Sequence, residues 1–201
     1  MTSATAIPRY IHCMVFLIVS AGCLHSRATP PVAAVDLIRE FDSADKRPPV
    51  GSSVAIHEID GITRPAIVVP VPSRMTWPLS LPRDGVFRAF VASRPAGDPP
   101  AASAVRLRVG ISDHRIYEGL SEVMLTPDDR KWTELRADLS AYAGWQWSLF
   151  YRPDRIAWRL VLAADATGAA PAIAMWASPE VLTDTESARE YATRRRQLPH
   201  P

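Results

Sequence analysis

The chain has 201 residues, of which 47% are hydrophobic and 22% are charged, and its formal net charge is only +2. This length is enough for one domain with a sizeable core and too short for two ordinary domains. The small net charge excludes a strongly basic surface for nucleic acid and an acidic disordered tail. Composition therefore predicts a single domain and leaves its function open.

Residues 1–22 have the pattern of a secretory signal. Arg9 is their only charge, residues 14–19 form a short apolar core, and small residues precede Cys23. The apolar run is less than half of the roughly 20 residues that a membrane-spanning helix needs. The sequence Val19-Ser20-Ala21-Gly22-Cys23 resembles the lipobox of bacterial lipoproteins.

That resemblance implies that residues 1–22 are removed and that the thiol of Cys23 carries a diacylglycerol, with palmitate-type acyl chains. Residues 23–34 would then be a lipidated tether, and Leu24 implies sorting to the outer membrane of the cell envelope. The alternative is an ordinary signal peptide with an incidental cysteine. Both cysteines lie within the first 23 residues, so the remaining chain has no thiol for a disulfide.

The next segments predict a β-sandwich flanked by two helices. Ala34, Leu37, Ile38 and Phe41 recur at helical spacing and predict a short N-terminal helix that ends before Pro48. From there, short runs rich in valine, isoleucine and aromatic residues are separated by proline, glycine or aspartate. The expected strands are 53–59, 65–71, 75–81, 86–93, 104–111, 115–118, 121–125, 132–138, 145–151, 156–163 and 172–177.

Alternation within these strands supports two sheets that pack face to face. In residues 104–111 the odd-numbered positions are apolar, whereas Arg106 and Arg108 face the other way. Crossover helices are not expected, because no long stretch of this region has helical periodicity. The predicted fold is all-β: an antiparallel two-sheet jelly-roll sandwich over residues 35–182, with a short N-terminal helix and a C-terminal helix.

The C-terminal segment, residues 183–201, is expected to hold a helix over about residues 184–197 and a short tail. Thr183 and Glu186 have the spacing of a capping box. Arg194, Arg195 and Arg196 would end this helix, where its dipole favours cations. They are either a solvated helix terminus or a contact for anionic lipid head groups.

The sequence contains no catalytic signature, so neither catalysis nor a cofactor is expected. His57-Glu58-Ile59-Asp60 and Asp113-His114 are the only pairs with the composition of a metal or acid–base site. On a strand, His57 and Glu58 would point to opposite faces and could not converge on one ion. Polar residues at strand ends are the simpler explanation, and no metal site is predicted.

Tryptophans are the better candidates for ligand binding, because a sugar ring stacks its C–H face on a flat aromatic ring. Tryptophan occurs at positions 77, 132, 145, 147, 158 and 176, and alternation places most of these in the core. Trp77 and Trp145 stand beside proline or glycine near turns, so they are the two candidate ligand-binding residues. A structural role is the alternative for both.

One longer stretch resembles a known family. Residues 132–151 begin with a tryptophan, continue through Asp138-Leu139-Ser140 and Ala143-Gly144, and end in an apolar strand. Residues 175–181 follow with Trp176 and Pro179. This order resembles the galactose-binding-like, carbohydrate-binding-type jelly rolls attached to bacterial sulfatases and other secreted enzymes. The resemblance implies a jelly-roll architecture and does not identify a ligand site.

These observations together predict a membrane-anchored lipoprotein whose sandwich is non-catalytic and binds a glycan or an envelope partner. The alternative is a structural lipoprotein that binds protein through the sandwich and has no sugar ligand; an enzyme ranks third. The expected partners are the membrane, through the N-terminal lipid, and a glycan or envelope protein, with no nucleic acid. An exposed Trp77 or Trp145 would favour the glycan, and a contiguous apolar patch would favour the scaffold.

Overall fold

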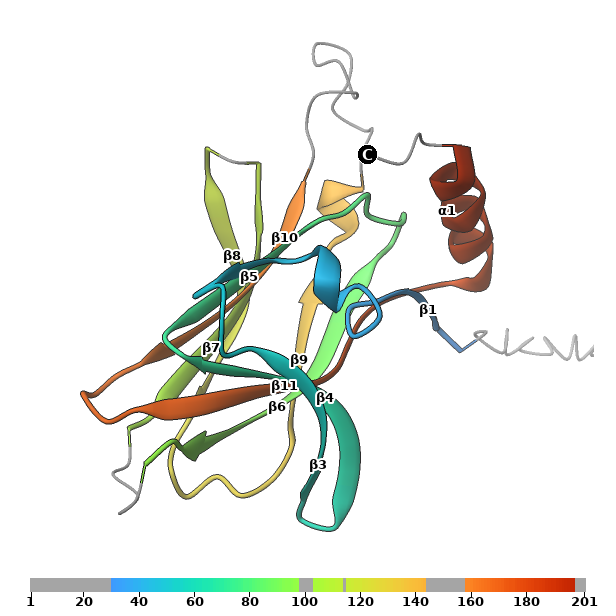
Figure 1. Cartoon of the computed structure of the whole chain (residues 1–201). Helices are drawn as coiled ribbons and strands as arrows, with labels where there is room; N and C mark the ends of the chain where they lie inside the picture. Colours follow the sequence, from blue (N-terminus) through green and yellow to red (C-terminus); the bar gives the residue numbers. More distant parts are fainter. Residues whose placement is uncertain (1–29, 98–102, 114, 144–157, 198–201) are drawn as a thin grey trace, which may run out of the picture.

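The computed structural model describes residues 30–97, 103–113, 115–143 and 158–197. They form two antiparallel sheets that pack face to face (Figure 1). The six-stranded sheet contains β1 (Val32–Asp36), β3 (Ser53–Ile59), β4 (Ile62–Val71), β6 (Val86–Pro95), β9 (Thr133–Asp138) and β11 (Ala172–Thr183). The five-stranded sheet contains β2 (Asp45–Arg47), β5 (Ser73–Pro78), β7 (Val105–Ser112), β8 (Tyr117–Leu125) and β10 (Arg159–Ala166).

The strand order confirms the predicted two-sheet sandwich. The first sheet has the order β3-β4-β11-β6-β9, with β1 also paired to β11, and the second has the order β2-β5-β10-β7-β8. Side chains on the two inner faces form one main core, in which Trp77, Trp176 and Phe87 are fully buried. The predicted alternation in β7 is confirmed, because its apolar residues enter this core while Arg106 and Arg108 do not.

Several strand boundaries differ from the prediction because tertiary pairing extends or merges the local patterns. The expected strands 115–118 and 121–125 form the single strand β8, whose pairing with β7 shifts register between Val109 and Gly110. The expected strand 172–177 continues to Thr183 through an irregularity at residues 177–180. The β3–β4 hairpin turns at Asp60 and Gly61, both with positive φ.

The predicted N-terminal helix is wrong. Residues Val32–Asp36 form β1 instead, because they pair with the C-terminal end of β11, from Glu180 to Thr183. The side chain of Asp36 then accepts a hydrogen bond from the backbone of Ile38 at 3.0 Å, which turns the chain away from the strand. Only a 3₁₀ turn follows, at Phe41–Ser43. Long-range pairing therefore outweighs the local helical spacing of these residues.

The C-terminal helix is confirmed as α1 (Thr185–Gln197), and Figure 1 shows it beside β1. The predicted capping box is wrong in its N-cap residue. Asp184 caps the helix, because its carboxylate accepts bonds from the backbone and the hydroxyl of Ser187, both at 2.8 Å. The hydroxyl of Thr183 donates instead to the carbonyl oxygen of Arg83 at 2.7 Å.

The sandwich begins at Val32, inside the segment 23–34 that was expected to be a tether. Cys23, the predicted strand 145–151 and the side chains of Arg194, Arg195 and Arg196 lie outside what the structure describes. Within the described ranges, the structure contains no helix with both the length and the apolar character needed to cross a bilayer.

Candidate functional site

The structure contradicts the predicted ligand-binding role of Trp77. Its side chain is 0% exposed within the main core, and its indole N–H donates to the carbonyl oxygen of Glu40 at 2.8 Å. A proline neighbour marks the end of β5, but the ring itself faces inward, so no sugar reaches it. Trp145, the second candidate, lies outside the described residues and stays a prediction.

The polar pairs singled out from the sequence do not converge on one site. His57 and Glu58 are successive residues of β3 and point to opposite faces. The Asp113 carboxylate accepts the backbone N–H groups of Arg115 and Ile116, which closes the β7–β8 turn and lowers the pKa of that carboxyl group. Among the described residues, no group of three metal-ligating side chains is found.

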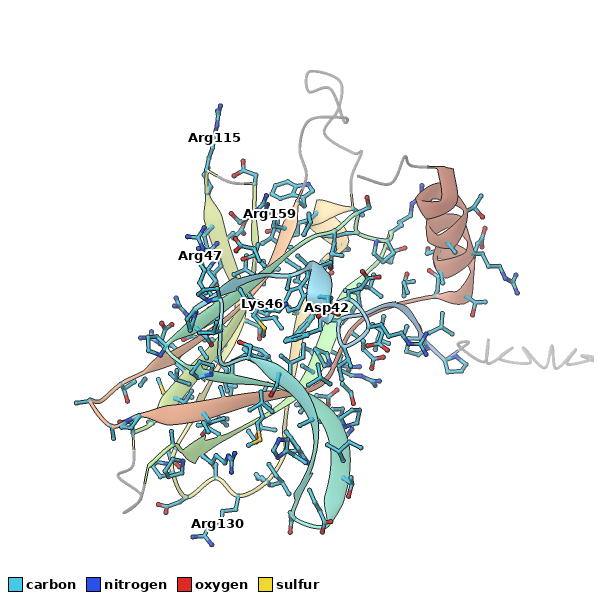
Figure 2. The ribbon with its side chains drawn as sticks, viewed as in Figure 1. Asp42, Lys46, Arg47, Arg115, Arg130 and Arg159 are labelled. Carbon is cyan, nitrogen blue, oxygen red and sulfur yellow. The ribbon has the colours of Figure 1, made fainter. Side chains whose placement is uncertain are left out.

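The outer face of the five-stranded sheet carries the densest set of charged side chains that share a surface. Register places five arginines on this face, which we call the arginine face: Arg47, Arg74, Arg106, Arg108 and Arg159. Arg47 and Arg159 are labelled in Figure 2, in the region of β5, β8 and β10. Three carboxylates share the face: Asp45, Glu122 and Asp165.

An exposed tyrosine, Tyr117 at the start of the edge strand β8, directs its ring over the arginine face. Gly110 and Gly119 are paired across β7 and β8, and neither has a side chain to occupy the surface above the sheet. The ring of Tyr117 fills that space: a Cβ added to Gly110 would lie 2.7 Å from its Cε2 atom. Tyr117 is still 37% exposed. The sheet therefore supports the ring from below and leaves part of it open to a ligand.

Charged groups of both signs lie near this tyrosine: Arg74 and Arg108, and the carboxylates of Asp165 and Glu122. The Arg74 guanidinium carbon lies 5.7 Å from the centre of the Tyr117 ring. Burial raises the pKa of the Tyr117 hydroxyl, although the charges of Arg108 and Arg74 act in the opposite direction. The hydroxyl is therefore protonated across the physiological range and is able to donate a hydrogen bond.

The arginines of this face differ in how their charges are compensated. Arg108 binds the carboxylate of Asp165, and this hydrogen bond raises the pKa of Arg108. Arg47 lies 3.6 Å from Asp45 in an exposed ion pair. The structure gives Arg74, Arg106 and Arg159 no ion pair with any described residue. The buried Nε atoms of Arg106, Arg108 and Arg159 also have no hydrogen-bond partner in the described part of the chain.

The outer face of the six-stranded sheet is different, because apolar side chains close it. Ala66, Ala92, Met175 and Ala177 form a second, smaller core on this face. Trp132 packs against it, and its indole N–H donates to the carbonyl oxygen of Ile62 in the β3–β4 hairpin at 3.0 Å. Trp132 is thus a structural residue that ties the start of β9 to this hairpin.

Charged groups at the edge of this smaller core have partners within the chain, except for the buried Nε of Arg64, which has no hydrogen-bond partner in the described part of the chain. The guanidinium carbon of Arg64 lies 3.6 Å from the centre of the Phe90 ring. Arg88 donates through Nε to the Glu180 carboxylate at 3.0 Å. We therefore place the candidate site on the arginine face.

Sequence reasoning found part of this site and missed its centre. Alternation in β7 correctly predicted that Arg106 and Arg108 point outward. It missed Tyr117, because the prediction concentrated on tryptophan. Gly110 and Gly119 were the available signal, since glycine inside a strand often marks a close approach of another group.

Comparison with known proteins adds a likeness of architecture. No protein-family model matches the chain, and no curated protein matches it. Among solved structures, it is similar to the CBM22-1 xylan-binding domain of Paenibacillus barcinonensis Xyn10C, with 14% identity and a TM-score of 0.46, over 79% of this chain and 99% of that one. A carbohydrate-binding module specific for non-crystalline cellulose, CBM28, gives 12% identity and a TM-score of 0.42, over 70% of this chain and 87% of that one.

The chain is also similar to the CBM22-1–GH10 modules of Clostridium thermocellum xylanase 10B, a structure complexed with xylohexaose. That match has 13% identity and a TM-score of 0.39, and it covers 77% of this chain but only 28% of that one. With TM-scores of 0.39 to 0.46 and identities of 12 to 14%, these likenesses carry no statement about function.

Proposed function

We propose that the protein is a lipid-anchored, non-catalytic β-sandwich that binds a glycan in the cell envelope. The observation that carries the proposal is the half-open Tyr117 ring, which rests on the paired glycines of β7 and β8 and is flanked by arginines. A sugar stacks its C–H face on such a ring while its hydroxyl groups bond to the polar side chains around it.

Glycan binding is tested with the full-length protein in detergent micelles, by affinity electrophoresis in gels that contain soluble polysaccharides. Tyr117→Ala should weaken retardation at least tenfold in apparent affinity, because it removes the stacking surface. Tyr117→Phe is the matched control, since it keeps the ring and should bind within about threefold of the wild type. Equal binding by the wild type and Tyr117→Ala would contradict the proposed site.

The lipid anchor is the second part of the proposal. It is supported by the lipobox-like run that ends at Cys23 and by the position of β1, which starts nine residues after that cysteine. Leu24 supports the outer membrane as the destination. Labelling cells with an alkyne analogue of palmitate should mark the wild-type protein and leave Cys23→Ser unmarked. A labelled Cys23→Ser variant would exclude Cys23 as the attachment site.

A scaffold that binds protein is a second candidate, favoured by apolar residues on the β3–β4 hairpin. Val54 and Ile56 lie on one side of β3 and are 40% and 74% exposed, and Ile62 at the start of β4 is 47% exposed. If this hairpin is the functional surface, the wild type should co-purify with an envelope protein and bind no glycan. Ile56→Glu should then abolish that co-purification. If the sandwich binds a glycan, the same variant should bind it normally.

A further inference from the structure

We infer that the arginine face takes an acidic glycan, a chain of sugars that carry carboxylate groups, rather than a neutral one. This inference rests on the proposed glycan-binding function and concerns the same surface. It is carried by the three arginines that have no ion pair with a described residue, Arg74, Arg106 and Arg159.

The first argument is the charge balance of the face. Asp165 compensates Arg108, and Asp45 lies beside Arg47. Glu122 is opposite Arg108 in the β7–β8 register rather than opposite any of the three remaining arginines. The whole face therefore carries five arginines against three carboxylates, an excess of positive charge that a neutral sugar would leave uncompensated.

The second argument is the state of the arginine side chains. The Nε atoms of Arg106 and Arg159 are buried without a hydrogen-bond partner among the described residues, although both side chains lie on an outer face. A buried donor without a partner is unfavourable, so these half-buried side chains gain when they turn outward far enough for Nε to reach a ligand's acceptor. Carboxylates fit this need, because the planar guanidinium fork binds them through two parallel hydrogen bonds.

The third argument is the spacing of the charges. Arg159 is opposite Ser112, and Arg106 lies six residues earlier on β7, opposite Asp165. Six residues of β-strand span about 20 Å. Groups so far apart cannot converge on a single phosphate or carboxylate. They match an extended chain whose acidic groups repeat at intervals, with one sugar on Tyr117, which lies nearer the Arg159 end of the face because both residues are opposite Ser112.

The spacing also disfavours nucleic acid. A duplex carries one negative charge per roughly 1.7 Å of its axis, and proteins that bind it use dense sets of basic residues. Three spaced arginines and a net charge of +2 do not provide such a surface. A chain with one carboxylate per sugar has a much lower charge density and fits this arrangement.

The test compares oligomers of galacturonate and mannuronate with neutral xylan oligomers, by calorimetry on the full-length protein in detergent. The double variant Arg106→Gln/Arg159→Gln should lose at least tenfold in affinity for the uronates. The control Arg39→Gln/Arg136→Gln removes the same charge from exposed ion pairs elsewhere and should change affinity less than threefold. Arg74 is exposed, so Arg74→Gln should also lower the affinity for the uronates, and it replaces the double variant if that variant unfolds.

Each other outcome overturns the inference in a distinguishable way. Equal losses of uronate affinity in the two double variants would show that only the net charge of the protein matters. Binding of neutral xylan that equals uronate binding would reject the acidic ligand and leave the proposed function standing. Binding of dextran sulfate and DNA with the affinity of the uronates would show unspecific adsorption of polyanions. Failure to bind any saccharide would reject the proposed function as well.

Discussion

On both outer faces of this sandwich an aromatic ring covers small residues, but the two rings differ in how much of each is left open to solvent. Each sheet has small residues on its outer surface: Ala66 and Ala177 on the six-stranded sheet, and Gly110 and Gly119 on the five-stranded sheet. On the first face, Trp132 covers the small residues, and its indole N–H donates to a carbonyl oxygen of the same chain. On the second, Tyr117 covers them and stays 37% exposed near Arg74, which has no ion pair with a described residue.

The difference shows that an aromatic residue at a sheet surface indicates a ligand only when its polar partners are also available. Trp132 also has a partly buried aromatic ring, yet its contacts are already made within the chain. The arginine face carries three buried Nε atoms that no described residue satisfies, against one, that of Arg64, on the first face. We therefore expect mutations on the first face to change stability and mutations on the second to change binding.

The largest effect should come from Trp132→Ala, which opens the closed face. Removal of this half-buried ring uncovers part of the smaller core, and we expect the free energy of unfolding to fall by about 2 to 3 kcal/mol, below the cost for a fully buried tryptophan. Glycan affinity measured below the unfolding temperature should stay within twofold. Urea denaturation and calorimetry check both values. Lost binding with unchanged stability would place the ligand on this face instead.

A smaller effect is expected from Gly110→Ala on the arginine face. The new Cβ would lie 2.3 Å from the carbonyl oxygen of Glu118 and 2.7 Å from the Tyr117 ring, so strand and ring must both shift. We expect a loss of about 1 to 3 kcal/mol in stability and weaker glycan binding.

Gly119→Ala is the matched control for that substitution. Its Cβ would lie 3.7 Å from the Tyr117 hydroxyl, an ordinary contact. Stability should change by less than about 0.5 kcal/mol. Thermal unfolding of both variants compares them directly, and similar losses would mean that the ring does not rest on Gly110.

Still smaller effects on stability are expected from two substitutions that each remove a carboxylate from an ion pair, one on each face. Asp165→Asn frees Arg108, and Glu180→Gln frees Arg88; both ion pairs are partly exposed, so each change should cost at most about 1 kcal/mol. Only Asp165→Asn should raise the affinity for uronate oligomers, by two- to fivefold. An equal rise in Glu180→Gln would show that the site does not distinguish the faces.

The smallest expected effect is a change of stability at acidic pH. Hydrogen bonds from the backbone and hydroxyl of Ser140 lower the pKa of Asp138 at the end of β9, and those from Ile116 and Arg115 lower the pKa of Asp113 beside the arginine face. A lowered folded-state pKa stabilises the protein above the ordinary range near 4, and that contribution disappears as the pH falls through the folded value. The stability advantage of the wild type over Asp138→Asn, and over Asp113→Asn, should therefore shrink on acidification. A constant difference would contradict the assignment.

Sequence patterns correctly predicted the features that depend only on residues close together in the chain. Strand 53–59 is found with the predicted bounds, and the Asp138 turn forms through the bond from the Ser140 backbone to its side chain. The pattern failed at residues 32–41, because helical spacing there competes with pairing to β11, more than 140 residues later. Single-sequence periodicity contains no information about that partner.

The candidate site shows the same limit. Alternation placed Arg106 and Arg108 outward, but nothing in one strand indicates which strand lies beside it. Arg74, Arg159 and Tyr117 come from three further strands and meet only through the sheet order. Trp77 failed for a related reason, since its proline neighbour predicts a turn and not the direction of the ring.

The pairing of β1 has a mechanical consequence. A pull on the chain from its N-terminal side enters the sandwich at Val32, where β1 pairs with Thr183 at the end of β11. β11 is an inner strand that β4 and β6 hold from both sides, so the load passes to the middle of a sheet rather than to a loose edge. The opposite sheet, which carries the arginine face, is not in the line of that force at its point of entry. Tension applied from the N-terminal side would thus be borne first by the six-stranded sheet rather than by the sheet that carries the arginine face.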